Sequence, residues 1–143
     1  MKNTIKTEEY SIKHTAPSVE EFIQLRADIG WGRINSQLAR QSLEHSLFHV
    51  TIRQQDQLIA MGRVVGDGAM YFYIQDVIVT KPFQKRGLGH SLMLEIEAYL
   101  EKQAKSGATI GLFAAKGKED FYHRYHYLAR PNNELGKGMC RFA

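Results

Sequence analysis

A loop that contains two glycines, between an apolar segment and an amphipathic one, most restricts how this chain can fold. Residues 77–79 are Val-Ile-Val, and apolar side chains recur at helical spacing from Leu92 to Leu100. Between these segments lies Gln84–Gly89, which includes Lys85 and Arg86. A strand–loop–helix unit of this kind brings backbone N–H groups and the positive end of a helix dipole together. The segment therefore predicts a layered fold with strands and helices, and a site for phosphate or pyrophosphate.

Apolar periodicity and turn residues predict the other elements. Ser18 and Glu21 have capping-box spacing and predict the start of the first helix, which Gly30 should end. Apolar runs bounded by glycine, proline and asparagine give the strands. The strand at 109–114 is nearly all apolar and is expected to be central in the sheet. The predicted strands are 5–13, 48–53, 58–65, 70–79, 109–114, 127–130 and 138–142, and the other predicted helices are 35–45, 92–106 and 119–126.

This element order predicts an α/β or α+β layer fold with mixed strand directions, built as one domain over residues 1–143. The net charge of +4 fits an anionic ligand, but the lysines and arginines are scattered, which argues against nucleic acid as a partner. No apolar run approaches the roughly 20 residues that a membrane span needs, and the first residues do not resemble a signal peptide. We therefore expect a cytoplasmic protein that does not bind membranes.

Cysteine and histidine give little chemistry. The single cysteine, Cys140, excludes an internal disulfide and suits a small buried side chain better than a nucleophile. His123 and His126 are three residues apart on a predicted helix, which is a spacing that could bind a metal. Because no carboxylate or cysteine pattern completes such a site, no metal is expected.

Three phosphate-binding patterns compete for the glycine loop. A Walker loop needs a lysine directly after its last glycine, but His90 follows Gly89 here. A dinucleotide fingerprint needs a third glycine where this chain has Leu92. The remaining pattern, Gln/Arg-x-x-Gly-x-Gly/Ala, is matched by Gln84–Gly89.

That last pattern resembles the acetyl-CoA signature of the GNAT (general control non-repressible-related) N-acetyltransferase superfamily. Its surroundings resemble family members too, with Asp76–Val79 before it, Pro82 and Phe83 in the connection, and Leu92 and Met93 after it. The element order is similar over nearly the whole chain, so the protein is identified as a small, bacterial-type, single-domain member. The resemblance implies a mixed, mostly antiparallel sheet flanked by helices and splayed at the cofactor strand.

The resemblance also implies the cosubstrate, acetyl-CoA, and the residues that bind it. The backbone of Ile78 and Val79 would pair with the pantetheine arm as an added strand does. Bare glycines let the backbone approach the pyrophosphate closely, and basic side chains offset its charge. The residues expected around the pyrophosphate are Gln84, Lys85, Arg86, Gly87, Leu88, Gly89 and His90.

Direct acetyl transfer needs an acid that protonates the departing thiolate. The segment Phe121–Tyr127 resembles the family's Phe-Tyr-x-x-x-Gly-Phe stretch, in which the first tyrosine often has this role. The role carries to Tyr122, and Tyr125 is the second candidate. His126 departs from the family by standing at the usual glycine, which bears on how Tyr122 is placed.

The other catalytic roles are more open. Asp76 precedes the cofactor segment, and its carboxylate could accept the amine's proton through water, orient a loop or bind a cationic substrate. By resemblance, the N–H of Ile78 or Val79 is the expected donor to the thioester oxygen as it becomes negative.

The acceptor is expected to be a primary amine, more readily a small molecule than a protein. In this family the acceptor pocket is built by the first two helices and their connection, which here includes Asp28 and Trp31; Tyr73 is also expected to line the slot. The alternative function is a non-catalytic acyl-CoA-binding or interaction module. Dimers are common in the family, so the resemblance allows a homodimer.

Overall fold

The structure is a computed structural model that describes residues 9–143. The chain divides into two units, Met1–Ile110 and Gly111–Ala143, and each is described by itself. The strand expected from residue 5 lies partly outside the described residues, and its described part is β1, Ser11–Lys13.

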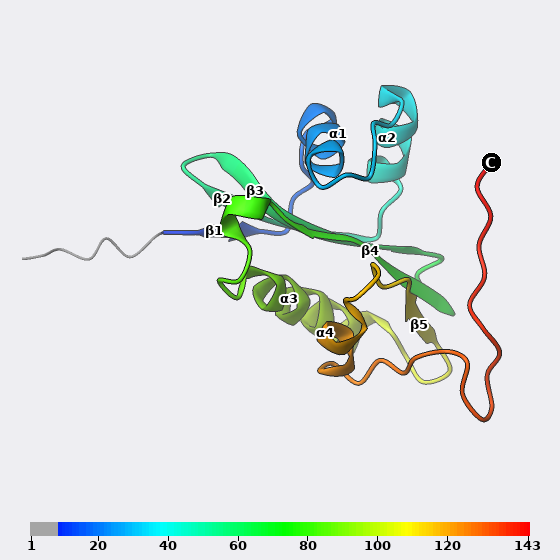
Figure 1. Ribbon diagram of the computed structural model, residues 1–143. Helices are drawn as coiled ribbons and strands as arrows, with labels where there is room; N and C mark the ends of the chain where they lie inside the picture. Colours follow the sequence, from blue (N-terminus) through cyan, green and yellow to red (C-terminus); the bar gives the residue numbers. More distant parts are fainter. Residues whose placement is uncertain (1–8) are drawn as a thin grey trace, which may run out of the picture. The chain divides into compact units, whose positions relative to one another are not determined.

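Five strands form one sheet in the order β1-β2-β3-β4-β5, and the β1–β2, β2–β3 and β3–β4 pairs are antiparallel (Figure 1). This confirms the predicted mixed, mostly antiparallel sheet flanked by helices. The elements after β1 are α1 (Val19–Asp28), α2 (Ser36–Glu44), β2 (Phe48–Gln54), β3 (Gln57–Gly66), β4 (Tyr71–Val79), a 3₁₀ turn (Lys81–Phe83), α3 (Leu88–Gln103), β5 (Thr109–Leu112) and α4 (Glu119–His123).

Local capping sets where the first two helices begin, as predicted. The Ser18 Oγ accepts a hydrogen bond from the Glu21 N–H at 3.1 Å, and the Glu21 carboxylate accepts one from the Ser18 N–H at 2.9 Å. Asn35 caps α2 because its Oδ1 accepts hydrogen bonds from the N–H groups of Gln37 and Leu38. These contacts satisfy backbone donors that a helix start leaves without partners.

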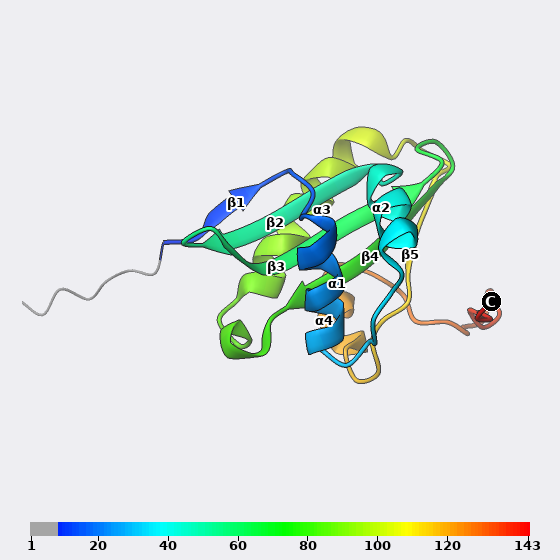
Figure 2. The same ribbon diagram turned by 90° about the horizontal axis from the view of Figure 1, so that it is seen from above.

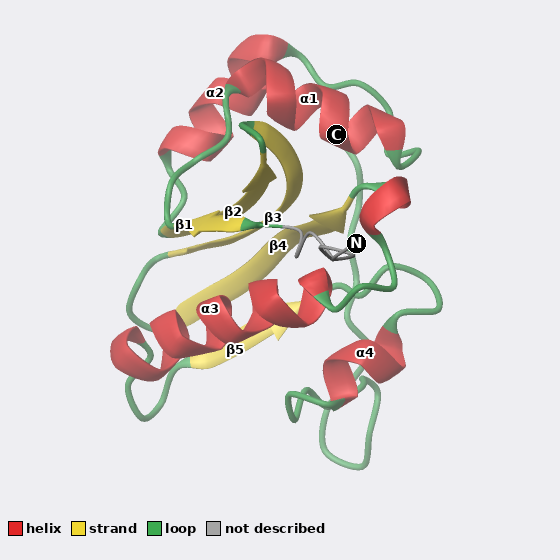
Figure 3. Cartoon of the chain, turned by 90° about the vertical axis from the view of Figure 1, so that its left-hand side faces the viewer, coloured by secondary structure: helices red, strands yellow, loops and turns green. Residues whose placement is uncertain are grey.

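Helices cover both faces of the sheet within the first unit. α1 and α2 lie over one face and α3 lies over the other (Figures 1 and 3). Viewed from above, α1 and α2 cross the strands on the near side of the sheet (Figure 2). The core beneath α1 and α2 is formed by Phe22, Ile23, Leu25, Ala39, Leu43, Leu58, Met61 and Ile78. The buried residues of α3 are Leu88, Leu92, Met93, Ile96 and Leu100.

A β-bulge interrupts the pairing of β3 with β4. Met61 pairs with Ile78 and Arg63 pairs with Gln75, so the single residue between them on β3, Gly62, faces two residues of β4. One of those two is Asp76, whose φ of 54° is in the left-handed region. An extra residue of this kind re-aims the strand that carries it.

Three predictions about the end of the chain are wrong. Cys140, which was expected to be buried, is exposed. The apolar strand that begins at Thr109 is last in the sheet order, and it is a sheet edge rather than a central strand. Residues 127–130 and 138–142 form no strands. The turn expected between them does form, with the Asn132 Oδ1 accepting hydrogen bonds from the N–H groups of Glu134 and Leu135 at 2.9 Å each. A strand-like pattern is not sufficient here because a strand needs a partner ladder, which these residues do not find.

Candidate active site

The glycine loop joins the end of β4 to the start of α3 by a sharp, hydrogen-bonded connection. The Gln84 side chain reaches back and donates its Nε2–H to the Val79 carbonyl at 2.9 Å. Gly87 is the N-cap of α3 and has a φ of 81°, a conformation in which glycine avoids the steric cost of a side chain. A Cβ on Gly87 would meet no atom within 4 Å, so conformation rather than space requires this glycine.

Basic side chains surround the start of α3. Lys85 and Arg86 are exposed in the loop, and the Arg86 guanidinium lies 5.1 Å from the centre of the Phe83 ring. Gly87 has no side chain to cap the N–H groups of the first turn, which belong to Leu88, Gly89 and His90. A helix of 16 residues begins here, so its dipole adds positive potential at the same place. The structure thus brings together the seven residues predicted for a pyrophosphate.

The register of β4 decides which backbone groups face away from β3. The Thr80 N–H donates to the Ile59 carbonyl at 2.9 Å. Successive residues of an antiparallel ladder direct their backbone groups to opposite sides, so Val79 points its N–H away from β3 and Ile78 points its own toward it. By the same alternation Val77 lies on the side of Val79. The register favours Val79 over Ile78 as an outward-facing donor. It adds Val77, which the sequence placed in the cofactor segment but not in a donor role.

Asp76 lies in a buried cluster of charges. Its side chain has no exposed surface, and each carboxylate oxygen accepts a hydrogen bond from a different arginine. Arg26 of α1 donates through Nη1, and Arg63 of β3 donates through Nε at 2.8 Å. Arg63 also donates to the Ser42 carbonyl and the Ser46 hydroxyl at the end of α2. Sequence reasoning missed both arginines, because nothing local links residues that are 50 and 13 positions from their partner.

Trp31 is held against Arg26 by the way α1 ends. The Trp31 N–H donates to the Arg26 carbonyl and the Gly30 N–H donates to the Ala27 carbonyl, both at 3.0 Å, while Gly30 has a φ of 89°. This is a Schellman motif, which places Trp31 beside the helix position of Arg26. The Arg26 guanidinium lies 5.3 Å from the Trp31 ring centre, a cation–π contact, and 42% of Trp31 remains exposed.

The other two residues predicted to bind the acceptor, Asp28 and Tyr73, lie at the end of α1 and on β4. Asp28 is exposed in the last turn of α1, where its Oδ1 accepts a hydrogen bond from Gln24 at 2.7 Å. Tyr73 is half-buried on β4 and pairs with Val65 of β3. Their roles in acceptor binding stay predictions.

In the second unit, Tyr122 lies on α4 among aromatic rings. The Phe121 ring packs edge-on against Tyr122 at 5.0 Å and against Tyr125 at 5.5 Å. Burial raises the pKa of the Tyr122 phenol above its ordinary value, and neighbouring Tyr125 raises it further. His126, which stands at the family's glycine, has a φ of 70° and adopts the left-handed conformation that glycine would favour.

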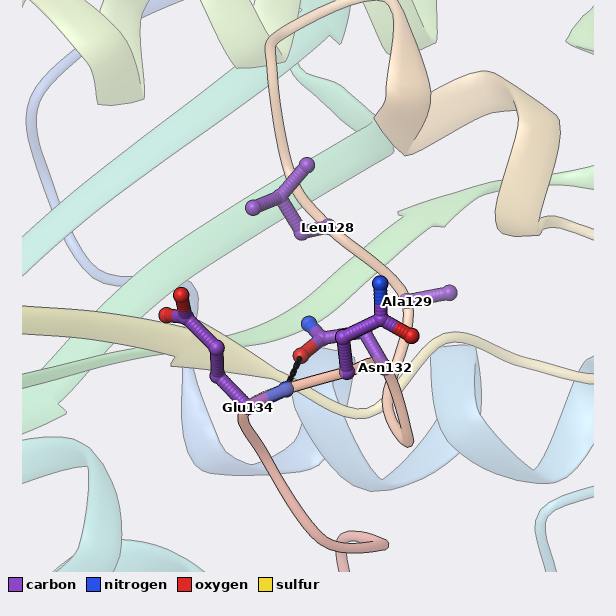
Figure 4. A pocket seen from close by; sticks show the side chains of 5 residues that line it. Leu128, Ala129, Asn132 and Glu134 are labelled. Carbon is purple, nitrogen blue, oxygen red and sulfur yellow. Dashed lines mark hydrogen bonds between the residues drawn. The ribbon is translucent and has the colours of Figure 1, made fainter.

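Two hollows lie on the surface. A hollow of about 360 Å³ is lined by Leu128, Ala129, Asn132, Asn133 and Glu134 (Figure 4), and one of about 370 Å³ lies on α2. Neither includes a predicted site residue.

Within residues 9–143, histidine, cysteine and carboxylate side chains form no group of three suited to a metal ion. In the same part of the chain, every helix is too short or too polar to cross a bilayer.

A mostly antiparallel sheet flanked by helices, whose fourth strand leads through a glycine loop into a long helix, defines an α/β protein of the layered class. The particular family follows from comparison with known proteins. The family model described as "Acetyltransferase (GNAT) domain" matches residues 19–142. The chain therefore belongs to the GNAT acetyltransferase family, as its glycine loop predicted.

Curated relatives carry related names. An uncharacterized ycf52-like N-acetyltransferase of Prochlorococcus marinus is 30% identical over 115 residues, which cover 78% of this chain and 63% of that protein. Serotonin N-acetyltransferase 2, chloroplastic, of Oryza sativa is 27% identical over 131 residues, which cover 89% of this chain and 64% of that protein. The chain thus spans less than two thirds of the length of these relatives.

Solved structures share the fold over nearly the full chain. A probable acetyltransferase of Staphylococcus aureus superposes with a TM-score of 0.85 at 26% identity, covering 94% of this chain and 100% of that one. A GNAT-family acetyltransferase of Streptococcus pneumoniae superposes with a TM-score of 0.76 at 26% identity, covering 94% and 98%.

Proposed function

We propose that this protein is an N-acetyltransferase that transfers an acetyl group directly from acetyl-CoA to a primary amine in a ternary complex. The proposal depends mainly on the loop Gln84–Gly89. This loop follows the end of β4, where backbone groups face away from β3, and leads into the long helix α3. Family membership and the names of the relatives support acyl transfer as the reaction class. The proposal treats residues 1–143 as one GNAT domain.

The loop supplies the features that a CoA pyrophosphate requires. Backbone N–H groups at the start of α3 would donate to its oxygens, and Lys85 and Arg86 would offset its charge. The Val79 N–H, directed away from β3, would pair with the pantetheine arm as in strand addition. No group in this scheme is a metal ligand.

Tyr122 is the proposed acid for the departing thiolate. Burial and Tyr125 keep the pKa of the phenol above its ordinary value, so the hydroxyl retains its proton at neutral pH and can donate it. As the amine attacks the thioester carbon, the carbon–sulfur bond breaks, and the phenol proton passes to the CoA sulfur. The amine's surplus proton leaves to solvent, and the phenolate is then reprotonated.

The contacts of Asp76 favour positioning over the base role predicted for it. Both carboxylate oxygens accept hydrogen bonds from arginines, and the side chain is fully enclosed. An amine or water could reach it only by displacing Arg26 or Arg63. The amine is therefore proposed to lose its proton to water rather than to Asp76.

Trp31 and the end of α1 are the proposed acceptor region. The exposed indole ring offers an apolar, electron-rich surface to an amine. Asp28 and Tyr73 are the other two residues proposed to bind the acceptor. The rice relative is named for serotonin, an aromatic amine, so such amines belong in any trial beside aliphatic ones.

The test is acetyl-CoA binding by calorimetry, followed by thiol release with a panel of amines that includes serotonin, tryptamine, spermidine and free amino acids. We expect acetyl-CoA to bind and at least one amine to accelerate thiol release well above hydrolysis. Tight CoA binding without transfer to any amine would favour the non-catalytic acyl-CoA-binding module. Absence of CoA binding would refute the assignment of the loop.

A further inference from the structure

Asp76 has an unusual backbone conformation that its side-chain contacts hold in place. It is the residue of the β4 bulge with a φ of 54°, a region in which a residue other than glycine is uncommon. Its carboxylate is enclosed and joined to α1 through Arg26 and to β3 through Arg63. We call these three residues the arginine clamp.

The clamp holds Asp76 from two independent directions. Arg63 is itself buried and fixed by the end of α2, with hydrogen bonds to the Ser42 carbonyl at 3.1 Å and the Ser46 hydroxyl at 3.0 Å. Arg26 comes from the other helix over this face, and 20% of its side chain is exposed. A buried carboxylate is tolerated only when it is paired and hydrogen-bonded, and the two arginines, with a longer contact from the Gln75 side chain at 3.4 Å, supply those partners for Asp76.

The backbone conformation of Asp76 sets the direction of the next N–H. The ψ angle of a residue rotates the peptide plane that follows it, and here that plane carries the Val77 N–H. By strand alternation this N–H lies on the same side of β4 as the Val79 N–H, away from β3. A donor aimed at a developing oxyanion contributes only when it is held in position before the reaction.

We propose that Arg26 and Arg63 are positioning residues for acetyl transfer. By clamping Asp76 in the bulge, they aim the Val77 N–H at the thioester carbonyl of acetyl-CoA, whose oxygen gains negative charge as the amine attacks. This inference rests on the proposed function and adds the device that orients the carbonyl donor.

Arg26 also connects the clamp to the proposed acceptor region. The same guanidinium that holds Asp76 lies 5.3 Å from the Trp31 ring centre and 5.7 Å from that of Phe22. A change at Trp31 on acceptor binding would therefore act on Arg26 directly. Trp31→Ala should therefore alter the infrared stretch of the thioester carbonyl in bound acetyl-CoA, although Trp31 is remote in sequence from β4.

The direct readout is the infrared stretch of ¹³C-labelled acetyl-CoA at its thioester carbonyl, bound to the full chain without acceptor. A hydrogen bond to the carbonyl lowers its stretching frequency relative to free acetyl-CoA. We expect this lowering in the wild type and a clear reduction of it in Arg26→Gln. The kcat of Arg26→Gln should fall about tenfold to a hundredfold, as for a misplaced reacting group, with little change in the KM for acetyl-CoA.

Arg53→Gln is the matched control. Arg53 also links α1 to the sheet, through two hydrogen bonds to Glu21 at 2.6 and 2.8 Å, but it does not touch Asp76. It should leave the carbonyl frequency and kcat close to those of the wild type. If Arg26→Gln is unstable, Arg26→Lys keeps the charge and loses the planar fork, and it should show a partial loss of the carbonyl shift.

The outcomes separate this inference from the proposed function. Acetyl-CoA that binds with a lowered frequency in both Arg26→Gln and the wild type would overturn the clamp and leave the transferase proposal standing. If Arg26→Gln and Arg53→Gln lose the carbonyl shift and kcat equally, both arginines only anchor α1. That result would also overturn the clamp. Failure of the wild type to bind acetyl-CoA would remove the proposed function itself.

Discussion

Gly62 of β3 and Ile96 of α3 pack so closely that a Cβ on Gly62 would lie 2.9 Å from the Ile96 Cδ1. Ile96 is fully buried, so its side chain has little room to move away. Gly62 also faces the β4 bulge, and its Cβ would lie 3.7 Å from the Val77 side chain. The missing side chain at Gly62 therefore lets α3 approach the sheet beside the β4 bulge.

Gly62→Ala should lower the free energy of unfolding by about 1–3 kcal/mol, because overpacking forces α3 or its side chains to shift. Ile96→Val removes the clashing Cδ1 and should cost about 0.5–1.5 kcal/mol alone. In the double variant the two losses should be less than additive, measured by urea unfolding of all four proteins. Strict additivity would show that Gly62 does not depend on Ile96.

Arg86→Ala should weaken acetyl-CoA binding about tenfold through loss of a charge-assisted contact to phosphate. Lys102→Ala is the matched control, since it removes the same charge from the last turn of the same helix. Titration calorimetry at two salt concentrations should show a weaker salt dependence for Arg86→Ala alone. Equal affinities in both variants would contradict the placement of the pyrophosphate at the start of α3.

Tyr122→Phe should reduce kcat about a hundredfold or more if its hydroxyl is the general acid, while acetyl-CoA affinity stays close to that of the wild type. Tyr125→Phe is the comparison, because it removes the hydroxyl of the neighbouring ring that contacts the same Phe121. Steady-state kinetics and binding should be measured on both. A larger loss in Tyr125→Phe would transfer the acid role to Tyr125.

The ion pair of Glu21 with Arg53 should make stability depend on pH in the acid range. Hydrogen bonding to Arg53 lowers the pKa of Glu21 from 4.5 to about 2. Because the folded pKa is the lower one, this stabilisation is present above pH 4.5 and is lost as the pH falls toward 2. Both side chains are partly exposed, so we expect a contribution of about 1–2 kcal/mol, discounted for solvent screening.

The measurement is urea unfolding of the wild type and Glu21→Gln between pH 7 and pH 2. The difference in unfolding free energy should be largest near neutrality and should shrink through the window from 4.5 to 2. Because Glu21 also completes the capping box, part of the difference belongs to the cap and varies with the same carboxylate. Arg53→Gln leaves the Ser18 contacts in place and isolates the ion pair.

Local patterns predicted the parts of this protein whose partners are near in sequence. Ser18 and Glu21 are three residues apart, and Gly30 ends the same helix, so the limits of α1 followed from chemistry within one or two turns. The loop Gln84–Gly89 was likewise predictable, because its glycines, its basic residues and the helix start are contiguous in the sequence. These local features were enough to indicate the family.

Tertiary structure alone decided the features that depend on distant residues. The sequence gives no sign that Arg26 and Arg63 meet at Asp76, because one ion pair depends on how α1 packs on the sheet and the other on how β3 pairs with β4. The bulge opposite Gly62 and the outward direction of Val77 depend on strand register, which is a property of two paired strands. The composition of segments 127–130 and 138–142 predicts strands. A strand also needs a neighbouring strand to pair with, and these segments have none in the folded chain.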